Sequence, residues 1–170
     1  MKALLRFLAL AALLATPLPA RAHQDVAVSI EDLARGAGVV VEGRVESAAS
    51  SWNATHTQIV TAVSVRVSQY VKGSGPETIR MQLLGGTVGE ITMAVLGQAE
   101  FTPAEDVFLF LSPTWESGQF PVVQGEHGKF SVRIDARSGR KVLSAPAINL
   151  FGDEVVRAVR SVSAARPIGR

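Results

Sequence analysis

The sequence predicts an all-β fold, an antiparallel OB-like barrel with one short helix near each end. Two long segments, residues 39–45 and 57–73, alternate along the chain with a period of two, which is the pattern of half-buried β-strands. Both are rich in valine and other β-branched residues, which suit a pleated surface. A polar segment, residues 47–56, separates them. We therefore expect a long first hairpin around which the other strands are arranged.

The start of the chain predicts a secretory signal peptide over residues 1–22. Lys2 and Arg6 make a basic n-region, residues 4–14 form an apolar h-region, and an A-x-A cleavage site ends at Ala22. The apolar run is too short to span a bilayer. We expect cleavage after Ala22, a secreted or periplasmic product, and no transmembrane segment in the mature chain.

Removal of the signal peptide changes the charge of the protein. The whole chain has 17 basic and 15 acidic side chains, and loss of Lys2, Arg6 and Arg21 leaves 14 against 15, a net charge of −1. The basic excess is therefore no sign of a nucleic-acid partner. The chain has no cysteine, which excludes disulfides, thiolate metal sites and a cysteine nucleophile. We expect one domain, residues 23–163, followed by a flexible tail at 164–170.

Short helices are predicted near both ends of this domain. In residues 29–36, Ser29 is placed to cap the first turn, Asp32 has the capping-box position, and Gly36 can end the helix in a left-handed conformation. From Asp153 onward the apolar spacing becomes helical, at Val155, Val156, Val159 and Val162.

The remaining apolar segments predict further strands at residues 77–84, 88–96, 105–113, 120–124, 129–134 and 141–143. Residues 105–113 are apolar on both faces, so this strand is expected to be the most buried. Gly85 and Gly86 lack the lysine of a phosphate-binding loop and predict a bulge or turn that lets the barrel bend. The strand number favours a closed or nearly closed barrel, with a two-sheet sandwich as the alternative.

The order of these segments resembles the netrin-like module, which is an OB-type barrel and the inhibitory domain of tissue inhibitors of metalloproteinases. The similar elements are VVVEGRV (39–45), VSQYVKG (67–73), GEITMAVLG (89–97) and VFLFL (107–111). The chain also resembles uncharacterised exported bacterial proteins that share the pattern Gly85-Gly86, Gly97, Phe101 and Gly128-Lys129-Phe130.

The resemblance implies an exported binding or inhibitory module, with a metalloprotease as one class of partner. In the metalloproteinase inhibitors the mature N-terminal cysteine chelates the zinc of the target through its amino and carbonyl groups. The matching position here is His23, which adds an imidazole nitrogen as a metal ligand. Gln24 would then enter the pocket of the protease, supported by the 47–56 loop. The chain departs from the animal modules in lacking their disulfides.

An alternative function uses the same residue as a copper ligand. The amino group and imidazole of an N-terminal His23, with the imidazole of His56 or His127, suit square-planar Cu(II). That combination would make the protein a copper-binding protein or a copper enzyme. In the simpler interpretation, His56 and His127 are solvated turn residues.

Other functions have weaker support in the sequence. No G-x-S-x-G motif is present, and Glu105 and Asp106 are best explained as a charged turn before a buried strand. We therefore expect a non-catalytic protein with no cofactor, whose partner is an unknown exported protein and not nucleic acid.

Aromatic side chains in predicted loops are the remaining contact candidates. Trp52 and Trp115 both lie in such loops, and an exposed tryptophan is a typical contact residue, whereas a buried one would cover an end of the barrel. The partner-binding set predicted from the sequence is therefore His23, Gln24, Trp52 and His56. A basic hairpin rim is a further surface that could meet an acidic partner, with Arg133, Arg137, Arg140 and Lys141.

Overall fold

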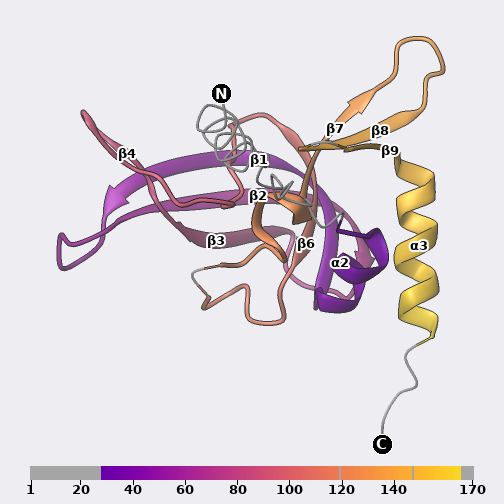
Figure 1. Cartoon of the computed structure of the whole chain (residues 1–170), viewed down its shortest axis with the longest axis horizontal. Coiled ribbons are helices and arrows are strands. Elements are labelled where there is room, and N and C mark those ends of the chain that lie inside the picture. The colour runs from indigo at the N-terminus through magenta and orange to yellow at the C-terminus, as the bar shows by residue number, and fades with distance from the viewer. Residues whose placement is uncertain (1–27, 119, 147, 166–170) are drawn as a thin grey trace, which may run out of the picture.

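The computed structural model describes residues 28–118, 120–146 and 148–165, and shows an antiparallel β-rich fold with a helix near each end (Figure 1). The predicted signal peptide, His23 and Gln24 lie outside this range. The helices are α2 (Ile30–Gly36) and α3 (Gly152–Ala164), with a 3-10 turn, η2 (Gly125–Gly128). The strands are β1 (Val39–Trp52), β2 (Ile59–Lys72), β3 (Thr78–Leu84), β4 (Gly86–Val88), β5 (Ile91–Met93), β6 (Asp106–Leu111), β7 (Lys129–Ile134), β8 (Lys141–Ala145) and β9 (Ile148–Phe151).

Seven strands form one sheet in the order β3-β2-β1-β6-β7-β8-β9, and β4 pairs with β5 in a separate hairpin. The long strand β1 is an interior strand of the sheet, because β2 pairs with one of its edges and β6 with the other. β3 and β9 are the edges of the sheet, so the pairings among the described residues do not close it into a barrel.

The sheet carries an apolar core on each face, and β6 contributes to both. Its side chains alternate between the cores, and all five residues after Asp106 are buried, which confirms the prediction for this segment. The first core lies on β1, β2, β3 and β6 and is covered by residues from the 94–124 segment. The second core lies between β6, β7, β8 and the two helices, which contact each other. Its largest members are Phe108, Phe110, Phe130, Leu33 and Leu143.

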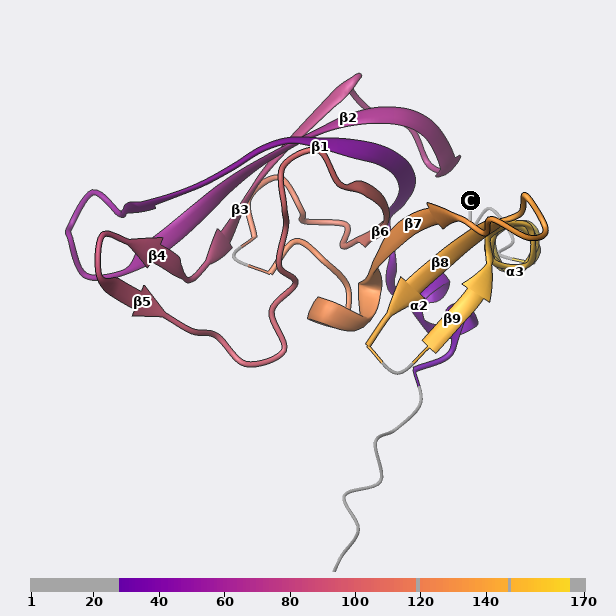
Figure 2. The ribbon, with the colours of Figure 1, turned by 90° about the horizontal axis from the view of Figure 1, so that it is seen from above.

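Besides its two faces, the molecule has two distinct ends. Figures 1 and 2 show α2, α3 and β7–β9 together at one end and the turn of the β1–β2 hairpin beside the β4–β5 hairpin at the other. We call the end that holds the two helices the helix end, and the end that holds the two hairpin turns the hairpin end. The 14-residue strands β1 and β2 link the two ends.

Both terminal helices occur where the sequence predicts them. Ser29 caps α2 by accepting a hydrogen bond from the backbone N–H of Asp32 at 3.1 Å. The predicted left-handed ending at Gly36 is wrong: the chain leaves the helix in an extended conformation at Ala37, whose N–H donates to the carbonyl of Leu33. In α3, Val155 and Val159 are buried in the second core. The helix runs through Ala164, the first residue assigned to the predicted tail.

The first hairpin is longer than predicted. The 47–56 segment was expected to be a loop, but β1 continues to Trp52 because its residues pair with β2 as far as Trp52 opposite Ile59. The periodicity also assigns the end of β2 to the wrong face. Gln69 lies opposite Glu42 and Val67 opposite Gly43, so Ser68 is an extra residue that reverses the alternation.

Strict alternation over residues 57–73 predicts Val71 on the face of Val65 and Tyr70 on the opposite face, and in the structure these two faces are exchanged. Tyr70 packs against the first core, and its hydroxyl donates to the carbonyl of Pro76 at 2.7 Å. Val71 packs against the second core.

Three further predictions of strands are corrected. Residues 88–96 form no continuous strand, because Gly89 has a φ of 60° and makes the turn between β4 and β5. Residues 120–124 contribute a single bridge, Val122 to Leu111, since Pro121 has no N–H for a ladder. The segment at 141–143 extends to Ala145 and is not the last strand, because β9 follows it.

Candidate functional site

The turn of the β1–β2 hairpin presents an aromatic pair. The rings of Trp52 and His56 are stacked, with centroids 6.3 Å apart and planes 21° from parallel. Trp52 is half-buried at the end of β1, and His56 is exposed. The sequence placed Trp52 in a loop, and the structure instead makes it the last residue of the strand. Two of the predicted contact residues are therefore brought together.

Asn53 organises the turn that produces this stack. Its Oδ1 accepts the backbone N–H groups of Thr57 at 2.9 Å and of Gln58 at 3.2 Å, and its Nδ2 donates to the Thr57 hydroxyl. The N–H of His56 donates to the carbonyl of Asn53. His56 has a φ of 53°, a left-handed conformation in which histidine is more often found than most residues. The turn is thus internally bonded and holds His56 over Trp52.

The second hairpin crosses the first at a glycine pair. The Thr61 hydroxyl donates to the carbonyl of Gly85 at 2.7 Å and contacts the Ser50 hydroxyl at 2.9 Å. A Cβ on Gly86 would collide with both hydroxyls, and its φ is 131°. Glycine is required here because the backbone of β4 passes directly over the side chains of β1 and β2. The predicted interruption at Gly85-Gly86 occurs as a break at Gly85 between β3 and β4, and Figure 2 shows β4 and β5 next to the long hairpin.

Between the two hairpins lies a hollow of about 380 Å³. Gln98 contributes to its lining, and the side-chain Nε2 of this residue is buried without a hydrogen-bond partner. Gln98 carries no motif, so sequence reasoning did not identify it.

Apolar side chains are also exposed on this part of the chain. Ile91 on β5 is 55% exposed, and Leu96, which follows it, is fully exposed. Trp115 differs from them, since it is buried in the first core. The second predicted loop tryptophan therefore covers the sheet and is no contact residue.

A partly buried charged cluster lies away from the hairpin turn. Glu105 accepts hydrogen bonds from Lys129 Nζ at 2.6 Å and from the Ser131 hydroxyl at 2.5 Å. Burial alone would raise the pKa of Glu105, but these hydrogen bonds and the charge of Lys129 outweigh it and lower that pKa below its usual value. A carboxylate held ionised in this way is a structural partner for Lys129 and a poor proton donor.

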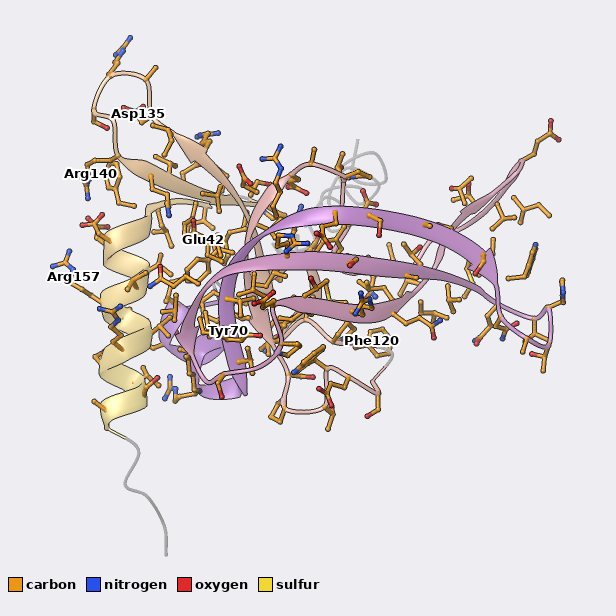
Figure 3. All side chains as sticks on the ribbon, turned by 180° about the vertical axis from the view of Figure 1, so that it is seen from behind. Glu42, Tyr70, Phe120, Asp135, Arg140 and Arg157 are labelled. Atoms are coloured by element: carbon orange, nitrogen blue, oxygen red, sulfur yellow. The ribbon has the colours of Figure 1, made fainter. Side chains whose placement is uncertain are left out.

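The predicted basic rim is largely paired. Arg140 donates to Asp153 at 2.8 Å, which raises the pKa of Arg140 and lowers that of Asp153, and its guanidinium lies 3.5 Å from the centre of the Phe151 ring. Lys141 bonds Glu42 at 2.5 Å. Figure 3 shows Arg140 and Glu42 on the side of the molecule that holds α3. These pairs join β8 to α3 and to β1.

The histidines do not gather in the described part of the chain. His56 lies in the turn of the β1–β2 hairpin, whereas His127 is exposed in η2, next to β6, β7 and β8. Among residues 28–118, 120–146 and 148–165, no three side chains of His, Cys, Asp or Glu form a group that could hold a metal ion. No helix in these ranges is long and apolar enough to cross a membrane.

Comparisons with known proteins add no further assignment. No family model, curated protein or solved structure matches this chain.

Proposed function

We propose that this protein is an exported, non-catalytic binding module that contacts a partner protein with its hairpin end. The observation that carries the proposal is the Trp52–His56 stack on the projecting turn of β1 and β2. Aromatic side chains held in one conformation bind with little loss of conformational entropy and dominate many interfaces. The exposed Ile91 on β5 adds apolar surface on the neighbouring hairpin.

The internal bonding of the turn supports this role. A turn that served only to reverse the chain would not need a histidine at positive φ, which is less favourable there than glycine. In this turn, Asn53 compensates with three hydrogen bonds. The result is a rigid surface that a partner can bind without first ordering it.

A finer form of the proposal is an OB-like, netrin-like inhibitor of a metalloprotease. The strand order β3-β2-β1-β6-β7 would be that of a five-stranded barrel if β7 met β3, and two terminal helices lie together on one face. In this form His23 and Gln24 make the contact with the protease.

The contact at His23 is separate from the contact at Trp52. His23 precedes Ser29 by six residues, which can span at most about 21 Å. Ser29 begins the helix end, whereas Trp52 lies at the far end of the 14-residue strand β1 (Figure 1). Variants of the two contacts therefore test two forms of the same proposal.

The experiment begins with the mass and N-terminal sequence of the exported protein. That protein is then used as bait for exported proteins of its source, in parallel with Trp52→Ala/His56→Ala and with the matched helix-end control Arg157→Ala. Each captured protein is purified and titrated against the three baits. We expect the double variant to weaken binding at least tenfold and the control to leave it unchanged. Equal affinity for all three baits would contradict the proposal.

Two further assays separate the finer form from its competitor. Inhibition of a zinc metalloprotease that requires His23 as the first residue would support the inhibitor. Tight binding of Cu(II) alone, lost in His56→Ala or in His127→Ala, would instead favour the copper-binding function.

A further inference from the structure

We propose that the hollow between the two hairpins binds a small neutral molecule that combines an apolar body with a carbonyl oxygen. The volume of about 380 Å³ falls in the range of small-molecule sites. The apolar part of the lining comes from β1, β3, β5 and the segment after β5, and includes Ala48, Leu83, Met93, Val95, Ala99 and Phe101.

The polar feature of the hollow is an unused donor. Gln98 Nε2 is buried and has no partner, although buried N–H groups are nearly always bonded. No acceptor of the described residues lies within hydrogen-bond distance of this Nε2. Gln98 contributes to the lining of the hollow, and a turn of its amide toward that space would place Nε2 against a ligand oxygen and satisfy the donor.

The charge of the lining selects the type of acceptor. Glu100 is its ionisable residue, and no lysine or arginine of the described chain belongs to the lining. A carboxylate ligand would meet a like charge without a compensating cation, which disfavours it. A neutral amide, ester or ketone oxygen accepts the same hydrogen bond without this penalty.

The glycine pair lets the chain approach the long hairpin closely at one side of the hollow. A Cβ on Gly85 would lie 2.8 Å from the carbonyl of Met93, and one on Gly86 would strike Ser50 and Thr61. Both glycines also line the hollow. This inference does not depend on a protein partner at Trp52, because the ligand enters between the hairpins.

The test uses the exported chain with methyl-¹³C methionine and two probes, N-methyloctanamide and octanoate. Binding is measured by calorimetry and by the chemical shift of the Met93 methyl group, which lies in the lining, with Met81 of the first core as an internal reference. We expect the amide to bind and to shift the Met93 resonance, and octanoate to bind at least tenfold more weakly.

Three variants locate the interaction. Gln98→Leu removes the donor and should weaken amide binding about tenfold, the value of one neutral hydrogen bond. Ala94→Phe, at an exposed position of the lining, should fill the space and abolish binding. Gln82→Leu, on the exposed face of β3, is the matched control and should leave binding unchanged.

The proposal is overturned if the amide does not bind the wild-type chain, if Gln98→Leu binds it as well as wild type, or if octanoate binds equally well. Should Ala94→Phe fail to fold, the wild-type Met93 shift and the Gln98→Leu affinity still decide the matter. Thermal unfolding of each variant confirms that the fold is retained.

Discussion

The helix end and the hairpin end of this protein are built in different ways. At the helix end, Phe108, Phe110 and Phe130 are all at most 1% exposed, with ring centroids 5.6 and 6.0 Å apart along the series. At the hairpin end, the stacked Trp52 and His56 lie on the turn, Ile91 on β5 is 55% exposed, and two hairpins meet across a hollow.

This difference indicates a division of roles. Buried apolar area is the main source of stability, and the helix end adds ion pairs that join α3 and β1 to β8. Exposed apolar side chains occur at both ends, for example Ile91 on β5 and Ile134 on β7, so the hairpin end differs in its stacked aromatic pair and in the hollow between the hairpins, features that are typical of binding sites. We therefore expect substitutions at the helix end to change stability and those at the hairpin turn to change binding.

The largest expected effect is that of Phe108→Ala. The ring is almost fully buried in the second core, so its removal should lower the free energy of unfolding by about 3–5 kcal/mol. Phe120→Ala is the matched control, because this phenylalanine is 56% exposed (Figure 3), and should change it by about 0.5 kcal/mol or less. Urea unfolding measures the free energy of unfolding of both variants. Similar losses in Phe108→Ala and Phe120→Ala would contradict the stabilising role given to the second core.

A glycine substitution tests the crossing of the hairpins. Gly86→Ala forces a Cβ against the Ser50 and Thr61 hydroxyls at a φ of 131° and should destabilise the fold by about 2–3 kcal/mol. Gly89→Ala, also at positive φ but with nothing within 4 Å of the added Cβ, should cost about 1 kcal/mol. Thermal unfolding separates them, and an equal effect would show that no close approach exists at Gly86.

The charged cluster makes a prediction about pH. The pKa of Glu105 is lower in the folded chain than its ordinary value of 4.5, despite the opposing effect of burial. The folded state therefore binds fewer protons than the unfolded state in this range, and the contribution of Glu105 is full above pH 4.5 and is lost as the pH falls through the folded pKa.

Glu105→Gln should accordingly destabilise the protein by about 1–3 kcal/mol at pH 7 and flatten the acid side of the stability profile. The exposed Glu116→Gln is the control. Urea unfolding from pH 3 to 7 is the measurement, and an unchanged profile in Glu105→Gln would contradict the assigned role of the Lys129 pair.

The smallest predicted effect concerns the cap of α2. Ser29→Ala removes the hydrogen bond to the N–H of Asp32 and should lower the free energy of unfolding by about 1 kcal/mol. Ser29→Asp keeps an acceptor and should restore most of it. If Ser29→Ala matches wild type in urea unfolding, α2 contributes less to the helix end than its packing indicates.

Features with a local pattern could be predicted from the sequence. The long hairpin, the doubly buried strand β6 and both helices follow from the spacing of apolar residues within each segment. The exchanged faces of Tyr70 and Val71 could not be predicted, because they depend on two residues that are skipped in the ladder with β1, Ser68 and Val71 itself. The β4–β5 turn was missed because Gly89 interrupts a segment whose composition still resembles one strand.

The candidate site was predicted only in part for the same reason. Trp52 and His56 were named as separate contact residues by type and by loop position, but their stacking depends on the turn that Asn53 builds. Gln98 has no sequence signal, since a donor without a partner is a property of tertiary packing. Predictions at His23 and Gln24 remain predictions, because both residues precede the described range.

Native-state hydrogen exchange tests the division between the two ends most directly. We predict that amides of β6 from Val107 to Phe110 exchange only through global unfolding, whereas those of the short strands β4 and β5 exchange through local opening at much lower free energy. We also predict that an added partner or ligand protects the second set and leaves the first unchanged. Equal protection of both ends in the free protein would contradict the account.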